Sequence, residues 1–265
     1  MGSDIETLLK RAVEAETLRI FLDYDGTLAA FAPTPDTILP DQKLIALIKK
    51  MVHSHGVLPA VISGRRLAHI QKLLPVKGLL LGGTYGIEMQ LPDGQLFNIL
   101  SFEEVRASIE PLIPLWKEWI GKSQAIYLED KGWALALHNR ITEPSDQEPV
   151  LLRISKMTEE IMPSEGFRLS GNERFLEIAP IKANKAEAVK LVLSKMTPSN
   201  ALVFYFGDDD KDEEAFRPVL DAGGFTIRIM KAPVQTKAQV LLKSPEELRG
   251  LLDQMVNARQ KRYEK

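Results

Sequence analysis

Short apolar runs that stop abruptly at polar or acidic residues alternate along most of this chain with segments of helical periodicity. The apolar runs are short enough for buried strands and cover residues 18–22, 57–62, 78–82, 202–206 and 225–229, with a short edge strand at 240–242. Helical spacing occurs in residues 4–17, 41–54, 66–74, 183–196 and 211–221, and Ser244 with Glu247 forms a capping-box pattern for a last helix. This alternation predicts an α/β fold, a doubly wound parallel sheet with helices on both faces.

The middle of the chain follows another order. Residues 102–120 and 147–162 have helical spacing, and each is followed by a pair of alternating segments typical of a hairpin, at 125–129 with 133–138 and at 167–170 with 174–178. An α+β unit inside an α/β pattern predicts an inserted second domain. We expect a core domain formed by residues 1–100 and 179–265, and an inserted domain of residues 101–178.

Composition excludes several classes of function. The chain has 265 residues, a formal net charge of −2 and no cysteine, so it has neither a basic field for nucleic acid or anionic membranes nor thiolates for disulfides or metal. No apolar run reaches the roughly 18 residues that cross a bilayer. The first residues lack the basic and apolar regions of a signal peptide. We therefore expect a cytoplasmic protein whose partner is a small molecule, with no nucleic acid and no membrane partner.

Two carboxylates, Asp23 and Asp25, stand directly after the apolar run 18–22. Ligands bind at this end of a strand in open α/β sheets. Like charges this close repel each other, so either one carboxyl keeps its proton or a cation lies between them. A solvated turn at a strand end is the alternative interpretation, and for an isolated pair it would be the preferred one.

A second acidic cluster, Asp208-Asp-Asp210, follows another apolar run, 202–206. Acidic residues also occur at helix N-termini, where the helix dipole favours them. Two such clusters at the ends of two strands of a parallel sheet nevertheless favour a site for a hard cation, which prefers oxygen ligands.

Between the two clusters, Ser63-Gly64-Arg65 follows the apolar run 57–62 at the start of a predicted helix. A hydroxyl and backbone N–H groups at such a position can bind phosphate, although a plain helix N-cap has the same pattern. The lysine that balances phosphate charge could be Lys182 or Lys185, and either could instead be a solvated lysine on a helix.

These motifs, in this order, resemble the haloacid dehalogenase superfamily, and more narrowly its trehalose-6-phosphate phosphatases. The resemblance covers nearly the whole chain, including Leu128–Arg140, Glu177–Pro180 with Asn184-Lys185, and Gly207–Phe216. It implies a Mg²⁺-dependent phosphoric monoester hydrolase of trehalose biosynthesis, with a core of the superfamily's fold and a substrate-specifying cap inserted into it.

The resemblance also implies roles for the core residues. Asp23 would be the nucleophile that forms an aspartyl-phosphate, and Asp25 the general acid and then the general base. Asp23, Asp208 and the backbone carbonyl of Asp25 would hold Mg²⁺.

Further core residues would bind the phosphoryl group or support the site. Ser63, Gly64 and Lys185 would contact the phosphoryl oxygens. Asp209 or Asp212 would orient the lysine or the water ligands of the metal.

In the cap, the resemblance implies that the sugar contacts Glu129, Lys131 and Glu177, with His138 and Arg140 as further candidates. His138 also has a structural interpretation, because a histidine on an alternating strand is often packed and hydrogen-bonded.

Three positions depart from the family pattern. Ala186 stands where the family usually has glycine, Lys211 where it usually has threonine or serine, and Tyr85 where it often has histidine. These departures leave the phosphoryl chemistry intact but bear on the substrate, which could instead be glucosylglycerol phosphate or glucosyl-3-phosphoglycerate.

Two other classes of function remain open. A phosphomutase would retain the phosphoryl group rather than pass it to water, and a non-catalytic module would only bind a sugar phosphate. The intact pair of Asp23 and Asp25 argues against the binding module, which needs no acid at Asp25.

Overall fold

The computed structural model describes residues 2–30, 38–123, 125–139, 149–162, 165–230 and 235–263. The chain divides into two compact units. The first unit consists of Met1–Phe97 and Asn184–Lys265, and the second unit is Asn98–Ala183. The segment that we expected as an inserted domain, residues 101–178, falls inside the second unit.

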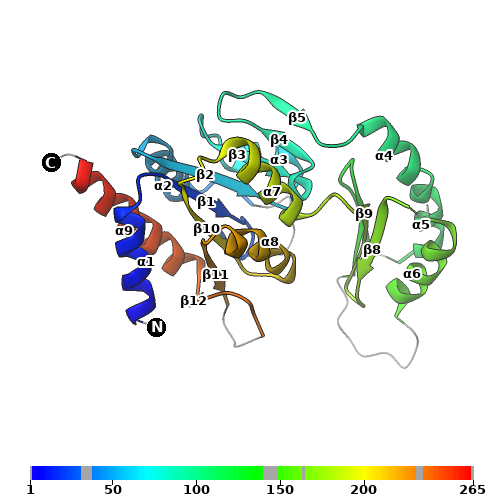
Figure 1. The fold of residues 1–265 in the computed structure, drawn as a ribbon. Helices are drawn as coiled ribbons and strands as arrows, with labels where there is room; N and C mark the ends of the chain where they lie inside the picture. The colour runs from blue at the N-terminus through cyan, green and yellow to red at the C-terminus, as the bar shows by residue number, and fades with distance from the viewer. Residues whose placement is uncertain are drawn as a thin grey trace. The chain divides into compact units, whose positions relative to one another are not determined.

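The first unit is built on an eight-stranded sheet with the order β12-β11-β10-β1-β2-β3-β4-β5 (Figure 1). Its strands are β1 (Leu18–Leu22), β2 (Val57–Ile62), β3 (Leu80–Gly83), β4 (Glu88–Gln90), β5 (Leu96–Asn98), β10 (Leu202–Gly207), β11 (Phe225–Ile229) and β12 (Val240–Leu242). All pairings from β12 to β3 are parallel. From β1 the chain continues to β2 on one side and returns later to β10 on the other, so the sheet has its switch point at β1. The predicted doubly wound fold is confirmed.

Helices cover both faces of this sheet, which explains why every residue of β1 is buried. They are α1 (Gly2–Glu14), α2 (Gln42–His53), α3 (Leu67–Leu73), α7 (Lys185–Met196), α8 (Asp210–Asp221) and α9 (Pro245–Tyr263), with a short 3₁₀ turn η2 (Thr84–Gly86). Ile20 and Leu22 belong to the core formed with α1, α2, α3 and α9. Phe21, on the opposite face, packs into the core formed with α7 and α8.

The second unit has a four-stranded antiparallel sheet with the order β6-β7-β9-β8 and helices α4, α5 and α6. The elements are α4 (Phe102–Ile109), α5 (Leu112–Ile120), β6 (Ile126–Asp130), β7 (Leu135–Asn139), α6 (Val150–Ile161), β8 (Phe167–Gly171) and β9 (Phe175–Pro180). The buried Trp116 of α5 donates to Thr158 of α6 at 2.9 Å.

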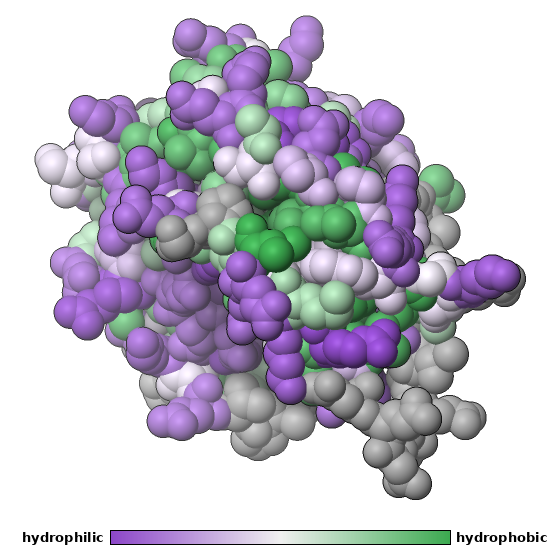
Figure 2. Space-filling model, turned by 90° about the vertical axis from the view of Figure 1, so that its right-hand side faces the viewer, coloured by the Kyte–Doolittle hydropathy of each residue, from purple (hydrophilic) through white to green (hydrophobic). Residues whose placement is uncertain are grey.

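The face of the molecule shown in Figure 2 carries a hydrophobic patch surrounded by hydrophilic residues.

The structure corrects the prediction at two places. The helix expected at 102–120 is two helices, because Pro111 lacks the N–H that a continuous helix would use and stands instead at the start of α5. The strands β4 and β5 were not predicted. Each has only three residues, and β4 pairs antiparallel with β3 at the edge of the parallel sheet.

Among the helices in the part of the chain that the structure describes, none has the length and apolarity needed to cross a bilayer.

Candidate active site

Asp23 stands at the carboxyl end of β1, beside the end of β10. Its N–H donates to the carbonyl of Phe206 at 3.0 Å and so prolongs the parallel ladder by one residue. The backbone then turns at Gly26, which has a φ of +80°. Asp23 is 4% exposed, so its carboxyl group is held at the switch point of the sheet and largely away from water.

Lys185, the first residue of α7, lies between two carboxylates. Its Nζ donates to Oδ1 of Asp23 and to Oδ1 of Asp212, both at 2.7 Å. Burial alone would lower the pKa of Lys185, but the charges of Asp212 and Asp23 outweigh burial and raise it well above its ordinary value. The lysine is therefore a permanent cation beside Asp23. Of the two lysines considered in the sequence, Lys185 contacts Asp23, whereas Lys182 is exposed.

Asp212 uses both of its oxygens inside the protein. Oδ1 also accepts from the hydroxyl of Tyr205 at 2.7 Å, and Oδ2 accepts from the N–H groups of Asp208 and Asp209 at 3.0 and 3.2 Å. A side chain at position 207 would meet this carboxylate, because a Cβ on Gly207 would lie 2.3 Å from Cγ of Asp212. These contacts indicate that Asp212 orients Lys185 and the turn after β10.

The turn after β10 is fixed by the start of α8. Asp209 is the N-cap, and it exchanges hydrogen bonds with Asp212 in a capping box. The Asp208 carboxylate next to it accepts from Thr27 Oγ1 at 3.0 Å, which connects this turn to the turn after β1.

Three carboxylates form a cluster at this point, with one oxygen each from Asp23, Asp208 and Asp212 within 4.8 Å of one another. Burial, followed by the charges of Asp212 and Asp209, raises the pKa of Asp208 to about 7. Burial also raises the pKa of Asp23 well above its ordinary value despite the opposing charge of Lys185. For Asp209, burial would raise the pKa, but Lys185 and the hydrogen bonds with Asp212 outweigh it and lower the pKa. Crowded, partly buried carboxylates of this kind fit a divalent cation.

The turn Ser63-Gly64-Arg65 follows β2 and is held from both ends. Ser63 N–H donates to Gly82 O at 2.9 Å, and Arg65 O accepts from Thr84 N–H at 2.7 Å. The buried Ser63 hydroxyl accepts from the N–H of Arg65 at 3.1 Å. Because β1 and β2 pair in parallel, this turn lies at the same edge of the sheet as Asp23.

Asp25 is paired with Arg65. Nε and Nη2 of Arg65 donate to the two carboxylate oxygens, each at 2.6 Å. Arg65 belongs to the Ser63-Gly64-Arg65 motif, but neither Arg65 nor Thr27 was predicted to have a role. The position of Arg65 in a strand-end turn was the signal that could have indicated it, whereas the contact between Thr27 and Asp208 depends on the pairing of β1 with β10.

Two of the three departures from the family pattern are neighbours in the structure. Lys211, in the first turn of α8, donates to the hydroxyl of Tyr85, and its Nζ lies 4.2 Å from the centre of the Tyr85 ring. The third departure, Ala186, is buried near the start of α7.

The predicted sugar-binding residues form a separate group on the sheet of the second unit. Lys131 Nζ donates to Oε2 of the fully buried Glu177 at 2.6 Å, and lies 3.9 Å from Oε2 of Glu129. His138 Nε2 lies 2.9 Å from the same Glu129 oxygen. Burial would raise the pKa of Glu129, but His138 and Lys131 outweigh it and lower the pKa. Arg140, the fifth candidate, lies outside the described residues.

Strand register explains why these carboxylates face a common space. Glu129 pairs with Ala136, and Ala136 pairs with Glu177. The two glutamates therefore flank the small side chain of Ala136 in one row across the sheet, which leaves room between them.

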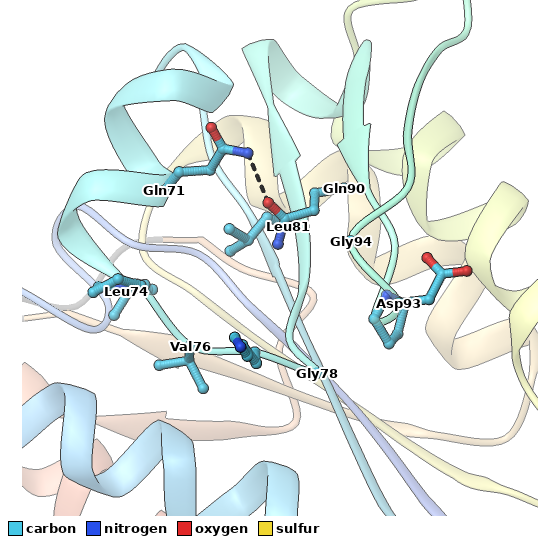
Figure 3. Close-up of a pocket in the computed structure, with 11 residues that line it drawn as sticks. Gln71, Leu74, Val76, Gly78, Leu81, Gln90, Asp93 and Gly94 are labelled. Carbon is cyan, nitrogen blue, oxygen red and sulfur yellow. Dashed lines mark hydrogen bonds between the residues drawn. The ribbon is translucent and has the colours of Figure 1, made fainter.

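A surface pocket of about 530 Å³ lies elsewhere in the first unit, between α3 and the turn after β4 (Figure 3). Gln71 donates to Gln90 across it at 2.7 Å, and its charged lining residues are Lys77 and Asp93. It opens beside Gly78, before the amino end of β3, whereas the carboxylates lie at the carboxyl ends of the strands. It lacks the acidic and cationic groups of the candidate active site.

Comparison with known proteins gives a consistent result. Residues 21–246 match the model of the trehalose-phosphatase family. A probable trehalose-phosphate phosphatase of Sinorhizobium fredii is 29% identical over 95% of this chain and 92% of its own length. Trehalose-phosphate phosphatase B of Arabidopsis thaliana is 25% identical over 94% of this chain and 69% of its own length.

Solved structures share the fold. The C-terminal domain of trehalose-6-phosphate phosphatase from C. albicans superposes with a TM-score of 0.82 at 21% identity, covering 96% of this chain and 97% of that chain. The enzyme of the same name from Aspergillus fumigatus gives a TM-score of 0.70 at 23% identity, covering 96% and 98%.

Proposed function

The chain belongs to the trehalose-phosphatase family, and from this premise we propose that it hydrolyses trehalose 6-phosphate to trehalose and inorganic phosphate. The observation that carries the proposal is the arrangement around Asp23. A buried carboxylate at the switch point of the sheet is bound by Lys185 and lies next to Asp208, and the turn of Ser63 lies at the same edge of the sheet. This arrangement supplies a nucleophile, a cation and phosphate-binding groups in one place.

In the first step, an oxygen of Asp23 attacks phosphorus. The bond between phosphorus and the sugar oxygen breaks, the phosphoryl group remains on Asp23 as an acyl phosphate, and Asp25 gives its proton to the departing sugar oxygen. Lys185 and the Ser63-Gly64 turn bind the phosphoryl oxygens, whose negative charge would otherwise oppose an anionic nucleophile.

In the second step, Asp25 takes a proton from water, and the resulting hydroxide attacks the phosphorus of the acyl phosphate. The bond between phosphorus and Asp23 breaks, which releases phosphate and restores the Asp23 carboxylate. Asp212 and Asp209 keep Lys185 and the turn after β10 in place through both steps.

We propose that the divalent cation at this site is Mg²⁺. Asp23, Asp208 and the backbone carbonyl of Asp25 would hold it. The cluster of carboxylates supports this assignment, because Mg²⁺ prefers oxygen ligands and often binds through one or two carboxylates together with the substrate's phosphate. When bound, Mg²⁺ would neutralise negative charge on the phosphoryl oxygens.

We further propose that the second unit is the cap that selects the sugar, while the first unit performs the chemistry. Glu129 and Glu177 can each accept hydrogen bonds from sugar hydroxyls, and Lys131 can donate to them. A site built from such groups discriminates against a substrate that lacks the matching hydroxyl, because buried polar groups then remain unpaired.

A phosphate-release assay over a panel of sugar phosphates tests the proposal. The panel contains trehalose 6-phosphate, glucosylglycerol phosphate and glucosyl-3-phosphoglycerate, each measured with Mg²⁺ and with EDTA. We expect the highest kcat/KM for trehalose 6-phosphate, and only with Mg²⁺. Preference for another member of the panel would mean that the substrate is different while the proposed phosphatase mechanism still holds. A folded protein that releases no phosphate from any member would contradict the proposed function.

A further inference from the structure

The turn that faces Ser63-Gly64-Arg65 has an unusual backbone. Thr84 and Tyr85 have φ of +47° and +59°, and they are the non-glycine residues with positive φ in the described part of the chain. Residues other than glycine rarely adopt this backbone conformation, so it persists only where surrounding contacts enforce it. Strain of this kind is common at ligand sites.

Backbone and side-chain hydrogen bonds enforce it here. Thr84 N–H donates to Arg65 O at 2.7 Å, and Tyr85 N–H donates to Ser63 O at 2.8 Å. The Thr84 hydroxyl donates to Glu88 Oε2 at 3.1 Å, and the same oxygen accepts from the N–H of Leu67 at the start of α3. The 3₁₀ turn is thus fastened to both ends of the proposed phosphate-binding turn.

The consequence is a fixed position for the Tyr85 ring, which packs directly on Gly64. A Cβ on Gly64 would lie 2.7 Å from Cε1 of Tyr85 and 3.1 Å from its hydroxyl oxygen. Tyr85 is 6% exposed. The ring and its hydroxyl therefore border the turn whose N–H groups we assign to phosphate.

Lys211 reaches this ring from the opposite side of the site. It belongs to α8, directly before Asp212, and its Nζ both bonds the Tyr85 hydroxyl and lies 4.2 Å from the ring centre. An ammonium group over an aromatic face is held by a cation–π interaction as well as by the hydrogen bond. The pair connects the first turn of α8 with the turn after β3.

The charges around the site indicate what the pair of Lys211 and Tyr85 could do. Lys185 is compensated by Asp23 and Asp212, and Arg65 by Asp25. A phosphate monoester that enters this acidic site carries up to two negative charges, so positive charge beside the phosphate-binding turn would favour its binding in addition to the proposed Mg²⁺. Lys211 places a positive charge there, where it bonds the Tyr85 hydroxyl and also, against the effect of burial and after Lys185, helps to lower the pKa of Asp209.

We propose that Lys211 is a second phosphate-binding cation of this site and that Tyr85 is the residue that positions it. The inference deepens the proposed function and relies on its location of the phosphoryl group. It gives Lys211 a direct contact with a phosphoryl oxygen, whereas Tyr85 acts through Lys211 and through the packing on Gly64.

Equilibrium binding of inorganic phosphate to the full chain in saturating Mg²⁺, followed by titration calorimetry, tests this without turnover. We expect Lys211→Met to raise the Kd for phosphate about tenfold, as for loss of one charged hydrogen bond, and Lys211→Arg to restore most of the affinity. Tyr85→Phe keeps the ring and removes the hydroxyl, so we expect a rise of roughly threefold. The matched control is Lys190→Met, which changes a lysine that is 58% exposed and is expected to leave the Kd unchanged.

Thermal unfolding of each variant separates binding from folding. A Kd for Lys211→Met equal to that of the control, or no recovery in a folded Lys211→Arg protein, would overturn the proposal. Failure of the wild-type protein to bind phosphate would overturn it as well. If phosphate binding depends on Lys211 but no sugar phosphate is hydrolysed, this inference stands and the proposed function fails.

Discussion

Arg65 binds both carboxylate oxygens of Asp25, each at 2.6 Å. Such a bidentate pair fixes the orientation of the Asp25 carboxylate. In the proposed mechanism Asp25 is the general acid and must reach the leaving oxygen. It would then have to exchange Arg65 for the substrate during the cycle.

The first prediction concerns the two steps that use Asp25. With p-nitrophenyl phosphate, whose leaving group needs no proton, Asp25→Asn should still form the acyl phosphate but hydrolyse it slowly. We expect a burst of nitrophenol equal to the enzyme concentration, followed by a rate lower by roughly 10²- to 10⁴-fold. Stopped-flow absorbance measures both phases. A linear time course at the wild-type rate would exclude Asp25 as the general base.

The second prediction concerns the nucleophile. Asp23→Asn should lower kcat by at least about 10³-fold, because an amide does not attack phosphorus. The protein should still fold, since Lys185 keeps its contact with Asp212. Phosphate release and the thermal unfolding midpoint, measured on the same preparation, check both statements. Turnover near the wild-type rate would contradict the mechanism.

The third prediction follows from the raised pKa of Asp208. Between the ordinary pKa of 3.8 and the raised pKa of about 7, the folded protein holds a proton that the unfolded chain has released. The free energy of unfolding of the metal-free protein should therefore fall as the pH rises through this window. Because Mg²⁺ binds the ionised carboxylates, the increase in Tm that it produces should grow from about pH 5.5 to about pH 7.5.

Scanning fluorimetry in EDTA and in Mg²⁺, from about pH 5.5 to about pH 7.5, measures the Tm values for this comparison. Asp208→Asn removes the titrating group, so its Tm in EDTA should depend less on pH, and it should need more Mg²⁺ for activity. Identical pH profiles for the variant and the wild-type protein would contradict the assignment of Asp208.

The fourth prediction concerns selection of the sugar. Glu129→Ala should reduce kcat/KM for trehalose 6-phosphate. The loss should correspond to roughly 1 to 3 kcal/mol of transition-state stabilisation, the range for a lost hydrogen bond to a charged group. It should leave p-nitrophenyl phosphate nearly unaffected, because that substrate needs only the first unit. Glu173→Ala, at an exposed position in the same unit, is the matched control. Equal losses on both substrates would show that Glu129 supports the fold instead.

The fifth prediction concerns stability. The buried Arg259 of α9 donates to four backbone carbonyls, those of Ala12, Ala15, Glu16 and His55. Arg259→Met would leave them without this donor, and we expect the free energy of unfolding to fall by roughly 2 to 4 kcal/mol.

Urea denaturation measures this loss. The control is Arg217→Met, because Arg217 is 76% exposed in a surface pair with Asp221 and should change the stability by less than about 1 kcal/mol. A similar small effect for Arg259→Met would mean that water replaces the guanidinium at these carbonyls.

Much of this molecule follows from local sequence pattern. Asp23 and Asp208 could be placed together because each ends a strand, and parallel strands end at one edge of the sheet. The contacts of Arg65 with Asp25 and of Lys211 with Tyr85 could not be predicted from the sequence. They depend on the directions of long side chains from elements far apart in the chain. The break at Pro111 was missed because the apolar spacing of residues 102–120 continues across it.

The pairing of β1 has a consequence for synthesis of the chain on the ribosome. One edge of β1 pairs with β2, which is made soon after it, whereas the other edge pairs with β10, which is made only after the whole second unit. A nascent or truncated chain that ends before Leu202 therefore presents the strand leading to Asp23 as an open edge, available for pairing with other chains. Such fragments should aggregate, and we expect activity only after β10 and Asp208, which lie in about the last quarter of the chain, have been translated.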